Sequence, residues 1–134
     1  MKVEVKMYGG LEGARKHCLE EIDRMSLTAR QKVITMLPGQ DEIYRAKRKE
    51  AERILAGESV SDFGWLPAEA RATGQSLDDL AAKVIDRALE SEQRLIDIEV
   101  VRMQSKDAIK KHSEIWQMYE TVEQARRKLD EING

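Results

Sequence analysis

The sequence predicts an all-α protein: a helical hairpin packed on a long third helix, with a C-terminal coiled-coil extension and a short N-terminal β-strand. Three observations lead to this fold class. Charged residues make up 36% of the chain and aromatic residues only 4%, which is typical of long helices and not of compact mixed folds. Apolar residues recur with a period near 3.6 over most of the sequence. Residues 110–134 continue this pattern as a heptad repeat.

We expect three parts: an arm of residues 1–10, a helical domain of residues 11–109 and a heptad extension of residues 110–134. In the arm, residues 2–8 alternate between charged and apolar side chains, which is the period of a strand. Because a lone strand is not stable in water, it should pair with another chain or lie on the helices. Gly9 and Gly10 end it.

Two helices should form the hairpin. The first covers residues 11–36, and its apolar stripe consists of Leu11, Ala14, Cys18, Ile22, Met25, Ala29, Val33 and Met36. Pro38 and Gly39 stop it. The second covers residues 41–56, with Asp41 as N-cap and an apolar face of Ile43, Tyr44, Ala51, Ile54 and Leu55. Pro67 then suits the first position of a short helix that ends at Gly74.

The last helix should start after Ser76, which forms a near capping box with Asp79. Its stripe consists of Leu77, Ala81, Val84, Ala88, Leu95 and Ile98. The phase then slips between Glu99 and Lys111, where Val100, Val101, Met103 and Ile109 leave the seam. If the helix continues to Ile132, it has about 56 residues and a length of roughly 84 Å. Part of it should therefore project as a coiled coil.

The terminal heptad predicts a binding surface. Its apolar positions are Ile115, Met118, Val122, Ala125, Leu129 and Ile132, and so narrow a stripe needs a partner helix from this chain or from another copy. Trp116 and Tyr119 flank the stripe, where aromatic residues anchor interfaces or fill a core. We predict a homo-oligomer and assign protein binding to Ile115, Trp116, Met118, Tyr119, Val122, Leu129 and Ile132. Val122→Asp should abolish association without unfolding the hairpin.

No catalytic, cofactor or metal site is expected. His17 and Cys18 are neighbours, but adjacent residues of a helix point about 100° apart and do not readily form a nucleophile–base pair. We expect a packed thiol at Cys18, a boundary imidazole at His17 and a surface imidazole at His112. The paired carboxylates along the helices are expected to be solvated, since a sugar-cleaving pair needs a cleft of aromatic residues. Phe63, Trp65 and Leu66 should plug the end of the helical core.

Charge and composition limit the partners. The net charge is −2, so no overall basic field attracts nucleic acid. The most basic segment contains Arg45, Lys47, Arg48, Lys49 and Arg53, interrupted by Glu50 and Glu52, which makes a nucleic-acid binder a minor alternative. A single cysteine fits a reducing compartment. No apolar stretch approaches the roughly 20 residues that span a bilayer, so we expect no membrane partner.

Several short motifs stand out along residues 34–109: residues 34–40 (ITMLPGQ), Tyr44, Lys47, Glu50, Ala51, Trp65, Leu66, Glu69, Ala70, residues 72–74 (ATG), residues 80–82 (LAA), Val84, Ile85, Glu99, Arg102, Lys106 and Ile109. Together they resemble a segment of small helical proteins found with the tail fibres of tailed phages and prophages. The resemblance covers about residues 14–109. The tryptophan typical of that group near Glu90 and Glu92 is absent, and the terminal heptad lies outside the shared pattern.

This resemblance implies a tail-associated protein, either a fibre-assembly chaperone or a structural element of the fibre, and it implies no reaction. Its partner would be a tail-fibre or other tail protein, met in the host cytoplasm during assembly or in the virion tail. The alternative is a small helical adaptor or inhibitor that docks on a host protein through its acidic faces. An enzyme is the least favoured class, because no nucleophile, base and cleft converge in the sequence.

Overall fold

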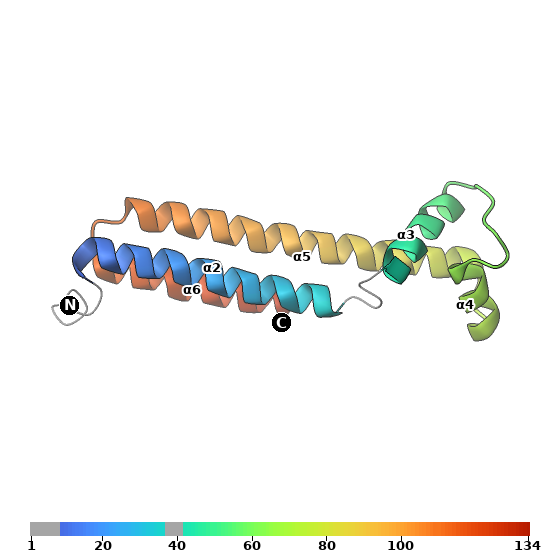
Figure 1. The fold of residues 1–134 in the computed structure, drawn as a ribbon, viewed down its shortest axis with the longest axis horizontal. Coiled ribbons are helices and arrows are strands. Elements are labelled where there is room, and N and C mark those ends of the chain that lie inside the picture. Colours follow the sequence, from blue (N-terminus) through green and yellow to red (C-terminus); the bar gives the residue numbers. More distant parts are fainter. Residues whose placement is uncertain (1–8, 37–41) are drawn as a thin grey trace. The chain divides into compact units, whose positions relative to one another are not determined.

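The computed structural model describes residues 9–36 and 42–134 (Figure 1). These residues form five helices and contain no strand: α2 (Gly10–Met36), α3 (Glu42–Leu55), α4 (Trp65–Thr73), α5 (Leu77–Lys111) and α6 (Ile115–Asn133). The all-α class is therefore confirmed for the described chain. The strand expected at residues 2–8, the stop at Pro38 and Gly39, and the N-cap at Asp41 lie outside the described residues.

The chain divides into two compact units, along lines that differ from the three parts expected. Unit 1 comprises Met1–Val33 and Arg94–Gly134, and unit 2 comprises Ile34–Gln93. Each unit has its own cluster of buried apolar side chains. Helix α5 contributes to both, because its residues up to Gln93 belong to unit 2 and those from Arg94 onward to unit 1. The two helices expected to form a hairpin over residues 11–56 therefore contribute their apolar faces to different cores.

Unit 1 is a bundle of α2, the second part of α5, and α6. Two contacts fix the directions of its helices. The Arg15 guanidinium donates to the carbonyl oxygens of Ile109 (2.7 Å) and His112 (2.9 Å), which places the start of α2 at the end of α5. Near the other end, Asn133 Nδ2 donates to the Ala29 carbonyl at 3.1 Å. Helix α2 thus runs parallel to α6 and antiparallel to α5, and the three lie side by side (Figure 1).

The apolar stripe of α2 faces this bundle as its spacing predicts. Ala14, Cys18, Ile22, Met25, Ala29 and Val33 are all buried in the core of unit 1. Leu11 is the exception, with 37% of its surface exposed in the first turn. Ser26, fully buried between Met25 and Ala29, shows that one polar position interrupts the stripe without ending its burial.

The expectation of one helix from Ser76 to Ile132 is wrong. The chain turns at residues 112–114, and α6 folds back along α5 in place of projecting from it. At the turn Glu114 is extended (φ −121°, ψ 139°). Its backbone N–H donates to Gln117 Oε1 at 3.2 Å, within the first turn of α6. A helix can begin there without proline or glycine because side chains satisfy its first donors.

The phase slip expected between Glu99 and Lys111 is also wrong in part. Val101 (8% exposed) and Ile109 (fully buried) lie in the core of unit 1 with Ile98. Ser105, 8% exposed, occupies the position between them. The buried stripe of α5 therefore continues at helical spacing through Ser105. Because Ser105 is polar, apolar periodicity alone does not reveal this continuation. Val100 and Met103 are exposed, as expected.

Unit 2 contains α3, α4 and the first part of α5. Its core consists of Ala51 and Ile54 from α3, Leu66 from α4, and Leu80 and Ala81 from α5. Helix α4 begins at Trp65, two residues before the position expected from Pro67. It ends as expected, because Gly74 adopts a left-handed conformation (φ 71°) and donates its N–H to the Ala70 carbonyl at 2.9 Å. Ser76 caps α5 through its hydroxyl, which accepts from the Asp79 N–H at 3.0 Å.

Candidate functional site

The residues predicted to bind a second protein lie mostly in the core of unit 1. Ile115, Met118, Val122 and Leu129 are between 0% and 6% exposed, packed against α2 and α5 of the same chain. Tyr119 and Ile132 are partly buried against the same cluster. Only Trp116, 51% exposed, offers a large open surface. The partner helix that the heptad requires is thus supplied by the chain itself. Protein binding by these residues stays a prediction, and the predicted homo-oligomer no longer has the seam as its basis.

The loop between α3 and α4 and the first residue of α4 each carry an exposed aromatic side chain. Phe63 is 94% exposed and Trp65 48% exposed, so the expectation that they plug a core is wrong for both. Leu66 alone fills the core of unit 2. Trp65 and Leu66 are adjacent in the first turn of α4, and adjacent residues of a helix point about 100° apart. Leu66 can therefore face the core while Trp65 faces solvent.

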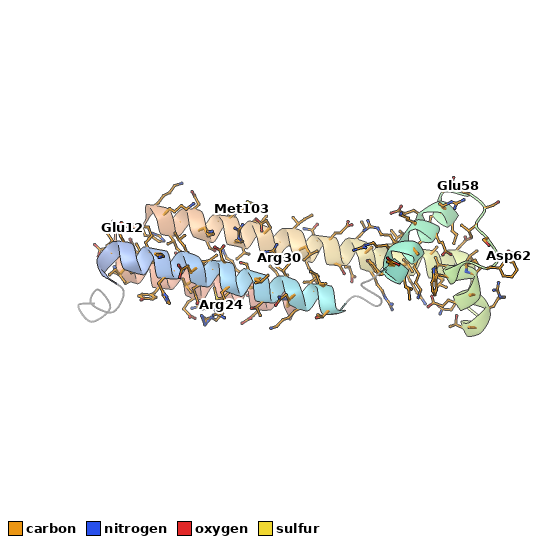
Figure 2. The ribbon with its side chains drawn as sticks, viewed as in Figure 1. Glu12, Arg24, Arg30, Glu58, Asp62 and Met103 are labelled. Atoms are coloured by element: carbon orange, nitrogen blue, oxygen red, sulfur yellow. The ribbon has the colours of Figure 1, made fainter. Side chains whose placement is uncertain are left out.

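The same loop is held by hydrogen bonds at several points. Arg53 donates to the Ser59 carbonyl at 3.1 Å, Arg71 to the Asp62 carbonyl at 2.8 Å, and the Phe63 N–H to Ser61 Oγ at 3.2 Å. Glu58 and Asp62 mark this loop among the side chains drawn in Figure 2. Phe63 is therefore presented on a loop with fixed geometry, which lowers the entropic cost of any contact that it makes.

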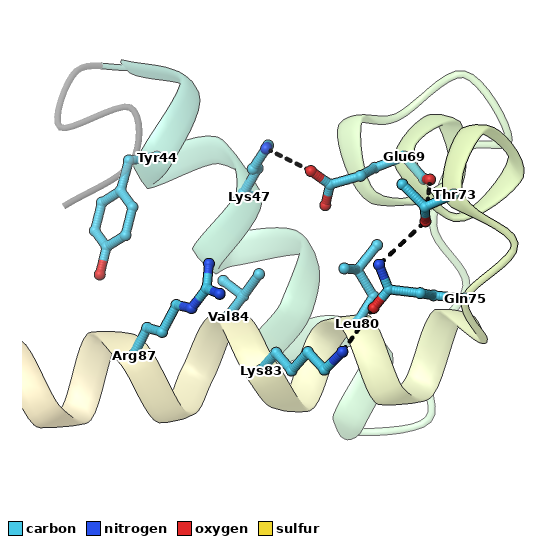
Figure 3. Close-up of a pocket in the computed structure, with 9 residues that line it drawn as sticks. All are labelled: Tyr44, Lys47, Glu69, Thr73, Gln75, Leu80, Lys83, Val84 and Arg87. Atoms are coloured by element: carbon cyan, nitrogen blue, oxygen red, sulfur yellow. Dashed lines mark hydrogen bonds and ion pairs between the residues drawn. The ribbon is translucent and has the colours of Figure 1, made fainter.

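A pocket of about 220 Å³ lies within unit 2, between α3, α4 and α5 (Figure 3). Helix α3 supplies Tyr44 and Lys47, α4 supplies Glu69 and Thr73, and the α4–α5 connection supplies Gln75. Helix α5 supplies the remaining lining residues at helical spacing, namely Leu80, Lys83, Val84 and Arg87. The lining thus combines three cationic side chains and one anionic side chain with two aliphatic residues and one aromatic ring.

Hydrogen bonds fix one side of this pocket. Lys47 Nζ pairs with Glu69 Oε1 at 3.1 Å. Lys83 Nζ donates to Gln75 Oε1 at 2.8 Å, and the amide nitrogen of Gln75 donates to Thr73 Oγ1 at 3.2 Å. The Gln75 amide is oriented by these two bonds so that its oxygen meets the Lys83 ammonium. The charge of Lys83 is solvated by this oxygen but not neutralised.

Tyr44 closes another side of the pocket. Burial is the main cause that raises the pKa of its phenol, while the charge of Arg48 lowers that pKa and the charge of Glu92 raises it. Arg48 is itself paired with Glu92 and Glu52. The hydroxyl is thus a neutral hydrogen-bond donor at physiological pH, next to an ion pair of α3 and α5.

Sequence reasoning missed most of this pocket. Lys47 was predicted only as part of the basic segment from Arg45 to Arg53 and of the tail-fibre resemblance, and neither of these predicts a pocket. Leu80, Lys83, Val84 and Arg87 recur at intervals of three, one and three residues, which is one face of a helix carrying cations beside an aliphatic stripe. That pattern was visible in the sequence, but the sequence does not show that α3 and α4 lie opposite this face and complete the pocket.

The basic segment itself is partly engaged in contacts of unit 2. Besides Lys47 and Arg48, whose partners are given above, Arg53 donates to the Ser59 carbonyl. Cations held by carboxylates of the same chain offer less to phosphate groups. The interruption by acidic residues seen in the sequence is therefore matched by ion pairing in the structure.

The remaining candidate residues have structural roles in unit 1. Cys18 is fully buried, and burial followed by the charge of Glu21 raises the pKa of its thiol. His112 is half-buried, with its Nε2 2.8 Å from Thr121 Oγ1, so the expectation of a plain surface imidazole is wrong. Asp23, one of the helix carboxylates expected to be solvated, is 45% exposed and also pairs with Arg102 and Lys106 across the bundle at 2.9 Å each.

Two searches of the described residues give negative results. No group of three or more histidine, cysteine, aspartate or glutamate side chains among them is arranged to hold a metal ion. No helix in the described part of the chain has the length and apolar character that crossing a membrane requires. Comparison with known proteins gives no family model, no curated relative and no solved structure that matches the chain.

Proposed function

We propose that this chain is an assembly factor or a structural protein associated with a phage or prophage tail fibre, and that it acts through protein–protein contacts. It would meet the fibre polypeptide in the host cytoplasm and either leave or stay with the virion tail. The observation that carries the proposal is the position of the residues that resemble tail-fibre-associated proteins: most of them come together in unit 2.

These residues have distinct structural roles within unit 2. Ala51, Leu66, Leu80 and Ala81 form most of its core. Glu50 accepts hydrogen bonds from the N–H groups of Trp65 and Leu66, at 3.0 and 3.1 Å, and so caps α4 from α3. Gly74 ends α4. The motifs between Tyr44 and Ile85 thus supply the core of one small three-helix unit and both ends of α4, as expected if the resemblance reflects a shared module. Glu99, Arg102, Lys106 and Ile109 belong to unit 1.

A second group of these residues faces a surface. Tyr44, Lys47, Glu69, Thr73 and Val84 line the pocket together with the core residue Leu80, and Trp65 follows the exposed Phe63 at a distance of two residues in the sequence. Aromatic side chains are frequent anchors of protein interfaces, and Phe63, 94% exposed, is presented on a hydrogen-bonded loop. We therefore place the contact with the fibre polypeptide at Phe63 and Trp65.

The test is co-expression of the chain with the tail-fibre polypeptide encoded in the same genome, followed by affinity capture and light scattering. The expected result is a stable complex and increased fibre solubility. Phe63→Ser should weaken this complex by at least about 10-fold, because exposed aromatic anchors dominate interface energies. Leu27→Ser, at a half-exposed position of α2 in unit 1, is the matched control and should leave the complex intact.

Two results would contradict parts of this proposal. The absence of any complex between the wild-type chain and the fibre polypeptide would remove the tail-fibre function and favour the adaptor or inhibitor of a host protein. A complex that tolerates Phe63→Ser would keep the function but move the contact away from the α3–α4 loop, and Trp116 of unit 1 would be the next residue to test.

A further inference from the structure

The pocket of unit 2 has an excess of positive charge that its own residues do not neutralise. Glu69 is the one carboxylate in its lining, and it is paired with Lys47. Lys83 contacts only the neutral amide oxygen of Gln75 in the hydrogen bonds given for it. Arg87 makes no hydrogen bond or ion pair with any residue that the structure describes. Glu92, whose charge acts on Tyr44, is paired with Arg48.

The geometry favours a ligand that is both anionic and apolar. Figure 3 shows Arg87 rising from α5 toward α3, on the same side of the pocket as the Tyr44 ring, with Val84 and Leu80 along the floor. A guanidinium matches a planar carboxylate through two parallel hydrogen bonds. The aliphatic floor and the ring would cover a short hydrocarbon stem attached to that carboxylate.

The size of the pocket restricts the ligand further. Its volume of about 220 Å³ is below the range of roughly 300–1,000 Å³ that holds drug-sized ligands and cofactors. A single acidic side chain or a small organic acid fits this volume better than a nucleotide. We propose that the pocket of unit 2 binds a carboxylate carried on a short apolar stem. This inference does not depend on the tail-fibre function.

The experiment is an NMR titration of the ¹⁵N-labelled full chain with hexanoate, followed at the backbone amides of Tyr44, Leu80 and Val84. Saturable shifts with millimolar affinity are expected for so small a ligand. Hexanamide has the same stem without the charge, and acetate has the charge with almost no stem. Acetate should bind at least about 10-fold more weakly, since two buried methylene groups alone contribute about that factor. Hexanamide should also bind at least about 10-fold more weakly, because it cannot form the charge-assisted pair with Arg87.

Two variants of the pocket should change hexanoate binding in opposite directions. Arg87→Gln should weaken it at least about 5-fold, because a charge-assisted pair is lost. Glu69→Gln should strengthen it about 2- to 5-fold, because Lys47 is released from its ion pair. A gain of affinity cannot result from misfolding, so Glu69→Gln tests the charge of the pocket independently of any folding defect in Arg87→Gln. Arg45→Gln, an exposed cation of α3 outside the pocket, is the matched control and should stay near wild type.

A parallel titration with a peptide distinguishes the two possible sources of the carboxylate. Tighter binding of acetyl-Leu-Glu-Leu-amide than of hexanoate would identify an acidic segment of a partner polypeptide. Tighter binding of hexanoate would identify a free small acid. The proposal is overturned if hexanoate gives no saturable shifts at these amides up to about 50 mM, if hexanamide binds equally well, or if Arg87→Gln leaves the affinity unchanged.

Discussion

Arg15 is the residue whose role in the fold most exceeds its role in the sequence pattern. Its guanidinium donates to three carbonyl oxygens at the end of α5, those of Ile109, Lys110 and His112. The last carbonyls of a helix have no partner within the helix. A cation at this end also interacts favourably with the negative end of the helix dipole. One side chain of α2 therefore ends α5 and holds the turn into α6.

We expect Arg15→Ala to lower the free energy of unfolding by about 1.5–3 kcal/mol, the usual cost of losing hydrogen bonds to a charged group. Arg15→Lys should recover only part of the loss, because an ammonium lacks the fork geometry that reaches several carbonyls. Urea unfolding followed by circular dichroism measures both. Arg127→Ala, at an exposed position of α6, should change little; an equal effect of the two alanine variants would contradict the role of Arg15.

Asp23 gives unit 1 a dependence on pH. Its pKa is lowered mainly by the hydrogen bond from Lys106 and further by that from Arg102. A carboxyl group whose pKa is lower in the folded than in the unfolded state stabilises the fold above the unfolded value, about 3.9. This contribution is lost as the pH falls through the folded-state pKa. Because the Asp23 side chain is 45% exposed, screening limits the contribution to about 1 kcal/mol or less.

Asp23→Asn should therefore be less stable than wild type at pH 7, and the difference should shrink as the pH falls through the folded-state pKa of Asp23, because the wild-type carboxyl then becomes protonated too. Denaturant unfolding at a series of pH values measures the difference. Asp130→Asn on the exposed face of α6 serves as the control. A difference between Asp23→Asn and wild type that did not shrink with falling pH would contradict ionisation as its cause.

At the scale of elements, α4 depends on a cap that another helix provides. The Glu50 carboxylate of α3 accepts from the first two N–H groups of α4. The residue before α4 is Gly64, and a Cβ atom added there would lie 2.6 Å from Glu50 Oε1. The φ of Gly64 is −70°, so the backbone does not require glycine. Space for the Glu50 carboxylate is what favours glycine at this position.

We expect Glu50→Ala to destabilise α4 by about 1–2 kcal/mol, as for other lost N-caps. Gly64→Ala should have a similar effect, because its methyl group displaces the same carboxylate. The double variant should be no worse than either single variant, since both remove one cap. Hydrogen exchange at the amides of Trp65 and Leu66 measures the loss. Additive effects would mean that the two residues act independently.

At the scale of the whole molecule, the two buried clusters predict two separable responses to mutation. Leu66→Ala removes a fully buried side chain of unit 2, and should lower the stability of that unit by about 2–5 kcal/mol. The amides of α6 should keep their protection from hydrogen exchange. Met118→Ala, at an equally buried position of unit 1, should give the reverse pattern. Loss of protection in both units from either variant would contradict separate cores.

Val122→Asp now has a different expected outcome from the one that the sequence predicts. Val122 is 6% exposed within unit 1, so an unpaired charge there should unfold the bundle and not simply abolish an association. A variant that stayed helical and lost only an oligomeric state would restore the sequence-based expectation of an external partner. Circular dichroism together with light scattering distinguishes the two outcomes.

The sequence predicted the helices well and their partners poorly, for physical reasons. Periodicity fixes which face of a helix is apolar, and the stripes of α2 and α6 are buried as predicted. It does not fix which helix covers that face. For α6, the turn at residues 112–114 determines that α2 and α5 of the same chain cover its apolar face. This turn, His112-Ser113-Glu114, contains neither proline nor glycine, so the sequence does not reveal it. The pocket was missed because Arg87 and Tyr44 meet only through the fold.

The discontinuity of unit 1 has a consequence for synthesis on the ribosome. Helix α2 emerges before unit 2, whereas the second part of α5 and α6 emerge after it. At about 5–20 residues per second, the roughly 60 residues of unit 2 hold α2 without its partners for about 3–12 s. Its apolar stripe is open to a chaperone, or to the same stripe of a neighbouring nascent chain, throughout that interval. Unit 2 is a continuous stretch of the chain, so it can fold before the helices that cover α2 have been synthesised.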